Sequence, residues 1–417
     1  MLKSIRLRNF RSYVDTDPIE LSQLNVFIGP NNAGKSAFLS AIELLLRSMR
    51  NPFMQGPLAF NEISSFASFD SVLRRHWTPK EGRPREFVLN YTWSAKDEAL
   101  VNLEFVCRGR KTDNLSYVRE ATYRLSDGQT FKINSSDEAS VPPVYQLVKN
   151  GSAVDSTHVV FQGPMPVIFS GKASPRLPIQ FGSPFINVEV VHPYRPVPRS
   201  FYVLDDPGLS MEDRLLLSFL IDVWKSEERK MVEVKQRIVD SLKTLGLITH
   251  LDIHQIGKRL GPKVVEISVA PKLKRQSVTI ADVGFGLSQV LPLAAYDARL
   301  ERGYLIAYQP EVHLHPYAQS RLADLFAKSV KRGNQVFVET HSPDLILRLQ
   351  AKVVSKELRP DEVKVFCLSN ERGTTEIVPV SFRPEGSPTI PWPPGFLDTS
   401  LTLARDLVSR RLGAANV

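Results

Sequence analysis

The chain has few cysteines and no long apolar run. Cys107 and Cys367 are the two cysteines among 417 residues, and each lies in an apolar, strand-like segment. We therefore expect two buried thiols in a reducing compartment and no cysteine metal cluster. No apolar run approaches the ~18 residues that span a bilayer, and residues 1–6 lack an apolar signal core. These absences favour a cytoplasmic protein with no membrane contact.

Internal repeats and low-complexity tracts are also absent. With 42% hydrophobic and 23% charged residues, the composition is that of an ordinary globular protein. The chain is long enough to build a full core in two or three lobes without cross-links.

Acidic residues are outnumbered by basic ones. Asp and Glu total 44 against 53 Lys and Arg, which gives a net charge of +9 and a sequence pI near 9.4. Such an excess favours binding to a polyanion, including nucleic acid. No aromatic-interleaved nucleic-acid motif accompanies the charge, so solvated loops explain the clusters equally well. The basic clusters lie at residues 74–76, 80–85, 108–111 and 272–275.

A phosphate-binding motif is the strongest signal in the chain. Residues 29–36 read Gly-Pro-Asn-Asn-Ala-Gly-Lys-Ser and fit the pattern G-x-x-x-x-G-K-[ST]. In such a loop, backbone N–H groups wrap the β-phosphate, the lysine neutralises the β/γ charge and the hydroxyl meets Mg²⁺. The predicted nucleotide ligands are Asn31, Asn32, Ala33, Gly34, Lys35 and Ser36.

The residues around this loop support the prediction. Residues 24–28 form a short apolar run suited to a buried strand, and apolar residues after Ser36 recur at helical spacing. The loop would therefore lie at the N-terminus of a helix, where the helix dipole favours phosphate. A glycine turn beside a surface lysine is the poorer explanation.

The rest of the chain divides into three predicted units. Alternating apolar residues and an Asp127-Gly128 hairpin signal indicate an antiparallel β lobe, so residues 1–136 form an N-terminal lobe with the phosphate loop. Residues 137–260 hold a proline-rich connection and a helical insertion, whose helical spacing covers residues 211–245. In residues 261–417 strands alternate with helices, which predicts a mostly parallel sheet flanked by helices and an α/β fold.

Three stretches of this last unit can complete a nucleotide site. Residues 282–289 place two glycines and a serine at the start of a helix, which is a second anion-binding position. Residues 304–311 and 336–342 are apolar strands that end in polar residues, at the sheet edge where α/β folds bind ligands. Each stretch also has a purely structural explanation when it is considered alone. These are a helix cap for residues 282–289, a proline turn for residues 304–311 and a core histidine for residues 336–342.

Together with the loop, these stretches resemble the ABC-type ATPase heads of the branch that contains RecF, the SMC proteins and the OLD (overcoming lysogenization defect) nucleases. Residues 2–13, 309–316 and 339–342 are also similar to that branch's signatures. Residues 192–199 and 392–398 resemble a bacterial subgroup of stand-alone OLD-like ATPases. The resemblance implies an ABC-ATPase head fold with ATP and Mg²⁺ as cofactors.

The resemblance also implies roles for single residues. Lys35 would hold the phosphates, Ser36 would contact Mg²⁺, and His341 would sense the γ-phosphate as a switch histidine. Two ATP molecules would be sandwiched between two subunits, which implies a homodimer or a higher homo-oligomer. The signature that reaches the neighbouring subunit's γ-phosphate would be Gly284, Gly286 and Ser288.

One position departs from the family pattern. Tyr308 stands where an acidic residue is expected before Gln309, and a neutral phenol is a poor ligand for Mg²⁺. Gln309 occupies the place where many ABC heads carry the catalytic glutamate. We expect Glu311, the nearest remaining carboxylate, to act as base or metal partner. Either hydrolysis is slow, or phosphates, Ser36 and water hold the metal, or Tyr308 is an engineered change.

The predicted function is an ATP-binding, dimerising ATPase that acts as a switch or sensor for a protein partner, such as an effector nuclease in anti-phage defence. No TOPRIM-like acidic cluster follows the head, so we expect no nuclease activity in this chain. The alternatives are a non-hydrolysing, nucleotide-gated scaffold and a DNA-binding ATPase of repair or chromosome maintenance.

Overall fold

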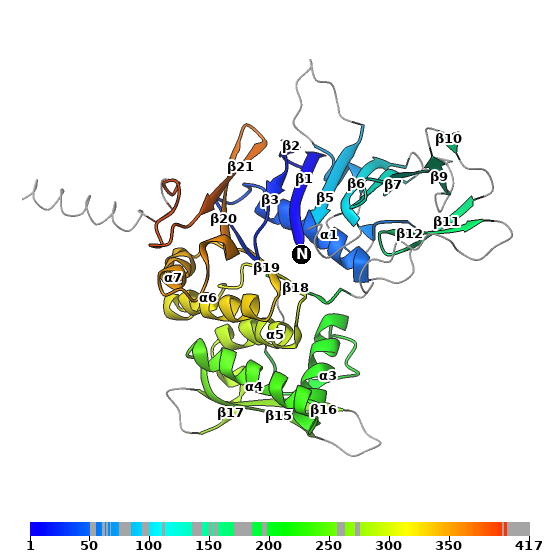
Figure 1. Cartoon of the computed structure of the whole chain (residues 1–417). Coiled ribbons are helices and arrows are strands. Elements are labelled where there is room, and N and C mark those ends of the chain that lie inside the picture. Colours follow the sequence, from blue (N-terminus) through cyan, green and yellow to red (C-terminus); the bar gives the residue numbers. More distant parts are fainter. Residues whose placement is uncertain are drawn as a thin grey trace, which may run out of the picture.

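The structure is a computed structural model that describes residues 1–50, 56–60, 63, 66, 68–74, 85–93, 100–110, 113–135, 144–149, 152–153, 157–170, 186–193, 198–256, 263–271, 276–393 and 396–397. Two large sheets and a smaller α/β unit make up this part of the chain (Figure 1). Helix α1 (Lys35–Arg50) packs between the two large sheets. Tyr91 of the antiparallel sheet donates a 2.7 Å hydrogen bond to the Ala41 carbonyl oxygen of α1.

The larger sheet is antiparallel and nine-stranded. Its alternating apolar residues face α1, as the period-two pattern predicts. A separate hairpin, β11 (Thr157–Gln162) and β12 (Met165–Ser170), lies beside β9. The strand order is β10 (Ser152–Ala153), β9 (Tyr145–Lys149), β8 (Thr130–Ser135), β7 (Ser116–Leu125), β6 (Leu100–Gly109), β5 (Phe87–Trp93), β1 (Leu2–Phe10) and β2 (Tyr13–Asp15), with β3 (Ile19–Glu20) paired to β1.

The second sheet is six-stranded and mostly parallel. Its central strands are buried along their whole length, because helices or the other sheet cover both faces, and this explains their continuous apolar sequences. The strand order is β13 (Val188–Val191), β18 (Tyr304–Tyr308), β19 (Gln335–Glu339), β4 (Leu24–Ile28), β20 (Val363–Glu371) and β21 (Thr374–Ser381), of which β21 alone is antiparallel to its neighbour.

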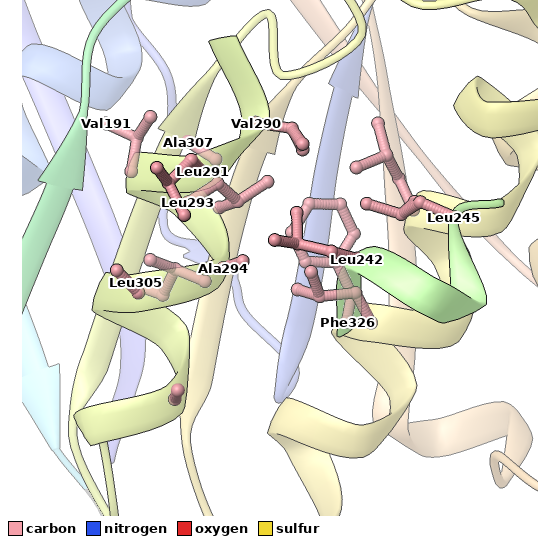
Figure 2. Close-up of a cluster of buried hydrophobic side chains, with 14 of the residues drawn as sticks. Val191, Leu242, Leu245, Val290, Leu291, Leu293, Ala294, Leu305, Ala307 and Phe326 are labelled. Atoms are coloured by element: carbon pink, nitrogen blue, oxygen red, sulfur yellow. The ribbon is translucent and has the colours of Figure 1, made fainter. Parts of the chain in front are cut away.

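Three helices cover the face of this sheet opposite α1. They are α5 (Phe285–Arg299), α6 (Pro316–Lys331) and α7 (Pro343–Val354). Figure 2 shows how α5 side chains such as Leu291 and Ala294 pack against Leu305 and Ala307 of β18. Phe326 of α6 belongs to the same buried cluster and is drawn beside Leu242. The short 3₁₀ helices η3 (Ile280–Asp282) and η4 (Pro360–Glu362) precede α5 and β20, and α2 (Phe69–Val72) lies near β6.

The smaller unit joins two helices to a short sheet. The helical spacing predicted over residues 211–245 forms two helices, α3 (Met211–Lys225) and α4 (Arg229–Thr244). Ser210 caps α3 by accepting the Asp213 backbone N–H at 3.1 Å, which matches the predicted capping signal. The helices pack on β15 (Ile248–Ile256), whose sheet also contains β14 (Tyr202–Val203), β16 (Val264–Pro271) and β17 (Val278–Thr279).

The predicted α/β class, with a mostly parallel sheet flanked by helices, an antiparallel β lobe and a helical insertion, is confirmed. Cys107 and Cys367 are buried free thiols, as expected. None of the helices in the described ranges is long and apolar enough to cross a membrane. The division into three units remains a prediction, and β15 and β16 form one antiparallel pair across residue 260.

Candidate nucleotide-binding site

The phosphate loop connects the buried strand β4 to helix α1, as the sequence predicts. Two of its glycines are required by geometry. A Cβ on Gly29 would lie 2.2 Å from the Leu368 carbonyl oxygen. Gly34 has a φ of 99°, in the region that glycine adopts without strain. Because α1 begins at Lys35, directly after the loop, the N-terminus of the helix and its positive dipole end lie at the loop.

A cavity of about 1100 Å³ lies over this loop. Its walls come from six separate parts of the chain. They are the loop, the turn between β1 and β2, α2, the segment after β18, the end of β19, and the end of β20 with its turn to β21. All six predicted loop ligands line it, from Asn31 to Ser36. The other lining residues are Arg11, Ser12, Pro30, Ala37, Ser71, Leu73, Gln309, Glu339, His341, Asn370 and Gly373.

Side chains from both ends of the chain hold the loop from behind. The Tyr13 hydroxyl donates to the Gly34 carbonyl oxygen at 2.8 Å. Thr375 Oγ1 lies within hydrogen-bonding distance of the Ala33 carbonyl oxygen (3.0 Å) and of Ser12 Oγ (2.7 Å). Because Tyr13 and Thr375 contact the carbonyl oxygens of Gly34 and Ala33, these contacts restrain the backbone of the loop.

Lys35 is buried at the floor of the cavity, where its ammonium group donates to the carbonyl oxygens of Gly29 (2.9 Å) and Pro30 (2.8 Å). Burial lowers the pKa of Lys35, while Glu339 and Glu311 act in the opposite direction. Arg11 adds a second cation to the cavity wall, and its guanidinium group lies 5.7 Å from the centre of the Phe66 ring. The cavity is thus suited to an anionic ligand.

Sequence reasoning missed the carboxylate that contacts this loop. Glu339, the last residue of β19, accepts a 2.9 Å hydrogen bond from Ser36 Oγ. Burial raises the pKa of Glu339, although Ser36 and Lys35 counteract that effect. The sequence did contain a signal for Glu339, because it is an acidic residue at the end of an apolar strand. The search for polar residues at strand ends had instead favoured the neighbouring strand at residues 304–308.

Tyr308 does not belong to the cavity. Its hydroxyl donates to Glu43 Oε2 at 2.7 Å, and Glu43 Oε1 accepts from Arg47 Nε at 2.7 Å. The His192 ring stacks on Tyr308 with the ring centres 5.4 Å apart. Burial, followed by the charge and hydrogen bond of Glu43, raises the pKa of Tyr308 well above its usual value. The phenol therefore ties β18 to α1 and stays protonated.

Glu311 and His341 are neighbours, although only His341 is among the residues that line the cavity. Glu311 is buried and accepts the His341 backbone N–H at 2.6 Å, so it fixes the loop that carries the histidine. Burial, together with the charge of Lys35, lowers the pKa of His341, which favours the neutral ring at pH 7. Gln309 lines the cavity, and its backbone N–H donates to the Glu339 carbonyl oxygen at 2.8 Å.

The structure does not bring Gly284, Gly286 and Ser288 to the phosphate loop of their own chain, since the cavity walls do not include them. They lie at the N-terminus of α5, where Gly284 is exposed. A Cβ on Gly286 would lie 2.9 Å from the His313 carbonyl oxygen, so this glycine allows α5 to approach the loop after β18.

The predicted basic clusters are only partly described. Residues 75–76, 80–84, 111 and 272–275 lie outside the described ranges. Of the remaining members, Arg108 pairs with Glu86 at 3.2 Å and Arg110 with Asp113 at 2.7 Å. The structure therefore leaves the nucleic-acid prediction untested.

Comparisons with solved structures found several SMC head domains. The chain is similar to the SMC head bound to the C-winged helix domain of ScpA (14% identity, TM-score 0.48, 91% of this chain and 97% of that chain). It is also similar to the SMC head domain from Thermotoga maritima (14% identity, TM-score 0.42, 91% of this chain and 98% of that chain). A third similar structure is the Smc head domain with an extended coiled coil bound to the C-terminal domain of ScpA derived from Pyrococcus furiosus. It has 13% identity and a TM-score of 0.47, over 97% of this chain and 99% of that chain. No curated protein matches the chain.

The sequence model of the AAA ATPase domain matches residues 1–140 and 216–346. These ranges make up more than half of the chain and contain the phosphate loop, β18 and the end of β19 with His341. The chain therefore belongs to the AAA ATPase domain family.

Proposed function

We propose that the chain binds ATP with Mg²⁺ in the cavity over the phosphate loop and hydrolyses it. The observation that carries the proposal is the convergence of Lys35 and Ser36 with Glu339 and His341 on one cavity of about 1100 Å³. Small-ligand pockets usually measure roughly 300–1000 Å³, so a nucleoside triphosphate fits. Membership of the AAA ATPase domain family supports the same ligand.

The residues divide the work of binding a triphosphate. The backbone N–H groups of residues 31–36 and the helix dipole of α1 would receive the β-phosphate, and Lys35 would neutralise the β/γ charge. Ser36 and Glu339 offer the hard oxygen donors that Mg²⁺ prefers, and one Glu339 oxygen has no hydrogen-bond partner among the described residues. Held there, Mg²⁺ would neutralise negative charge on the phosphates.

A second copy of the chain would complete the site. Gly284 and Ser288 belong to the end of α5, outside the cavity of their own chain, and the neighbouring Phe285 is an exposed apolar side chain. The resemblance to ABC-type heads supports their action on the nucleotide of a neighbouring subunit. The proposed assembly is an ATP-dependent homodimer, and the protein would act as a switch or sensor for a partner.

A nucleotide-gated scaffold that does not hydrolyse ATP is the second candidate. The observation that favours it is Gln309, because a neutral amide lines the cavity where many ABC heads carry a glutamate base. Gln309→Glu separates the two candidates. If the wild type hydrolyses ATP, the variant should have a similar rate of hydrolysis. If the wild type is a scaffold, the added base should give the variant a hydrolysis rate that the wild type lacks.

The finer assignments stay predictions. They are an effector nuclease as partner, a role in anti-phage defence, DNA maintenance and a cytoplasmic location. Direct DNA binding through lysine and arginine must weaken steeply between 50 and 200 mM salt, because counterions are released. DNA affinity that does not change with salt would exclude that mode of binding.

Nucleotide binding is tested with a fluorescent ATP analogue and the purified chain. Lys35→Ala should weaken binding by about 10- to 100-fold, the size of a lost charge-assisted interaction. Lys230→Ala, a change of an exposed lysine on α4, is the matched control and should bind as the wild type does. Equal affinity in Lys35→Ala and the wild type would contradict the proposed site.

A further inference from the structure

The end of β19 places a carboxylate directly against the phosphate loop. Glu339 pairs in register with Phe27 of β4, one residue before that strand ends and the loop begins. Its side chain lines the cavity, is 3% exposed, and accepts the 2.9 Å hydrogen bond from Ser36. Ser36 is the loop residue whose hydroxyl meets the metal in this motif.

One oxygen of this carboxylate is not used within the protein. Glu339 Oε2 is buried and has no hydrogen-bond partner in the described part of the chain. None of the ion pairs found there includes Glu339, because Lys35 directs its ammonium group to the carbonyl oxygens of Gly29 and Pro30. Buried polar atoms are normally satisfied, so an unsatisfied oxygen on a carboxylate residue that lines a cavity indicates a ligand.

The two other candidates for this role are engaged elsewhere. The Tyr308 hydroxyl donates a hydrogen bond to Glu43 at 2.7 Å, and Glu311 accepts the His341 backbone N–H at 2.6 Å. Neither residue belongs to the set that lines the cavity. Among the acidic residues of the described ranges, Glu339 is the one in the cavity wall.

We propose that Glu339, together with Ser36, binds the Mg²⁺ of a bound nucleoside triphosphate, so that β19 supplies the metal carboxylate that β18 lacks at Tyr308. The inference rests on the proposed nucleotide function. No group of three or more His, Cys, Asp or Glu residues in the described chain could hold a metal. Mg²⁺ commonly binds proteins through one or two carboxylates and takes its other ligands from phosphate and water, so the pair suffices.

The consequence is a strict division between two glutamates. Glu339 acts on the cation, and Glu311 is a positioning residue that holds the His341 backbone. Replacing Glu339 with Gln keeps the shape and removes the charge that binds Mg²⁺. Replacing Glu311 with Gln leaves both proposed metal ligands in place, so this variant tests the competing carboxylate.

The test measures the affinity for ADP and for a non-hydrolysable ATP analogue, each with Mg²⁺ and with EDTA, in the wild type and both glutamine variants. Mg²⁺ should strengthen binding to the wild type and to Glu311→Gln. In Glu339→Gln that gain should fall by at least about tenfold, since even partners behind metal ligands change metal affinity about 10- to 100-fold. Binding in EDTA should be equal or stronger, because a negative charge near the phosphates is gone.

A spectroscopic readout separates metal binding from chemistry. Mn²⁺ added with the nucleotide should give the signal of bound ion by electron paramagnetic resonance in the wild type and lose it in Glu339→Gln. Ser36→Ala, which removes the other member of the pair, should show the same loss if Glu339→Gln does not fold. A full Mg²⁺ gain in Glu339→Gln, or its loss in Glu311→Gln alone, would overturn the assignment. Absence of nucleotide binding by the wild type, even in EDTA, would overturn the proposed function itself.

Discussion

The hydroxyl of Tyr13 donates a 2.8 Å hydrogen bond to the carbonyl oxygen of Gly34, so strand β2 holds the phosphate loop directly. Thr375, far away in sequence, approaches the Ala33 carbonyl oxygen at 3.0 Å. The loop is therefore supported by both ends of the chain. Its conformation depends on contacts that no loop motif contains.

Removal of either support should weaken nucleotide binding without unfolding the protein. Tyr13→Phe removes the hydrogen bond to Gly34, and Thr375→Val removes the contacts of Thr375 Oγ1 with Ala33 and Ser12. A lost hydrogen bond costs about 1 kcal/mol, so each change should lower ATP affinity by about fivefold or more. The measurement is titration with a fluorescent ATP analogue, alongside the thermal midpoint. Tyr317→Phe, at an exposed tyrosine of α6, is the control. Affinity unchanged in both variants would mean that the loop needs no support from behind.

Tyr308 should prove to be a stability residue. Tyr308→Phe removes a donor from Glu43, which is 2% exposed, and should cost about 1–3 kcal/mol of unfolding free energy. Tyr308→Glu would place a second buried carboxylate against Glu43 and should cost more. Urea denaturation measures both effects, and a double-mutant cycle with Glu43→Gln isolates the pair. A Tyr308→Glu protein as stable as the wild type, with stronger Mg²⁺ binding, would show that β18 holds the metal site.

Asp324 should make stability depend on pH through the packing of α6 on α7. It accepts hydrogen bonds from Arg321 (3.1 Å) and Arg348 (3.2 Å) and pairs with Lys352. Burial raises the pKa of Asp324, but the hydrogen bonds from Lys352, Arg348 and Arg321 outweigh it and lower the pKa overall. A lowered folded-state pKa adds stability that is present above the unfolded-state pKa of about 3.9 and is lost as pH falls through the folded-state value.

Asp324→Asn should therefore lower the unfolding free energy at pH 7 by about 2 kcal/mol, the size of a hydrogen bond to a charged group. The difference from the wild type should shrink as the pH falls below about 4. Urea unfolding at both pH values measures it. An equal difference at pH 7 and at low pH would show that the charge of Asp324 contributes nothing.

The signature at α5 should control pairing of two chains. Ser288→Arg adds a bulky cation at the proposed contact with a second copy and should abolish dimers formed with a non-hydrolysable ATP analogue. Light scattering gives the mass in solution. Ser355→Arg, at the exposed end of α7, should dimerise normally. Dimers that persist in Ser288→Arg would place the interface elsewhere.

Local signals were enough to predict much of this structure. The phosphate loop, β18, β19, α6 and α7 each carry an apolar run, a helical spacing or a cap within a few residues. These features depend on neighbours in sequence, which is why one chain suffices to recognise them.

The site's remaining features depend on strand register and could not be predicted in that way. The contact between Glu339 and Ser36 exists because β19 lies beside β4, and nothing near residue 339 specifies that neighbour. The family pattern has a metal-binding acidic residue at position 308, yet the side chain of Tyr308 reaches Glu43 of α1. The strand β13, only four residues long, joins the parallel sheet from a stretch whose path the sequence did not reveal.

The measurement that tests the central claim most directly is ATP turnover with Mg²⁺ by the purified chain, beside Lys35→Ala and Glu339→Gln. The account predicts turnover by the wild type that is lost in Lys35→Ala and strongly reduced in Glu339→Gln at every Mg²⁺ concentration below saturation. Turnover that survives in Lys35→Ala, or a wild type that binds no nucleotide, would contradict it.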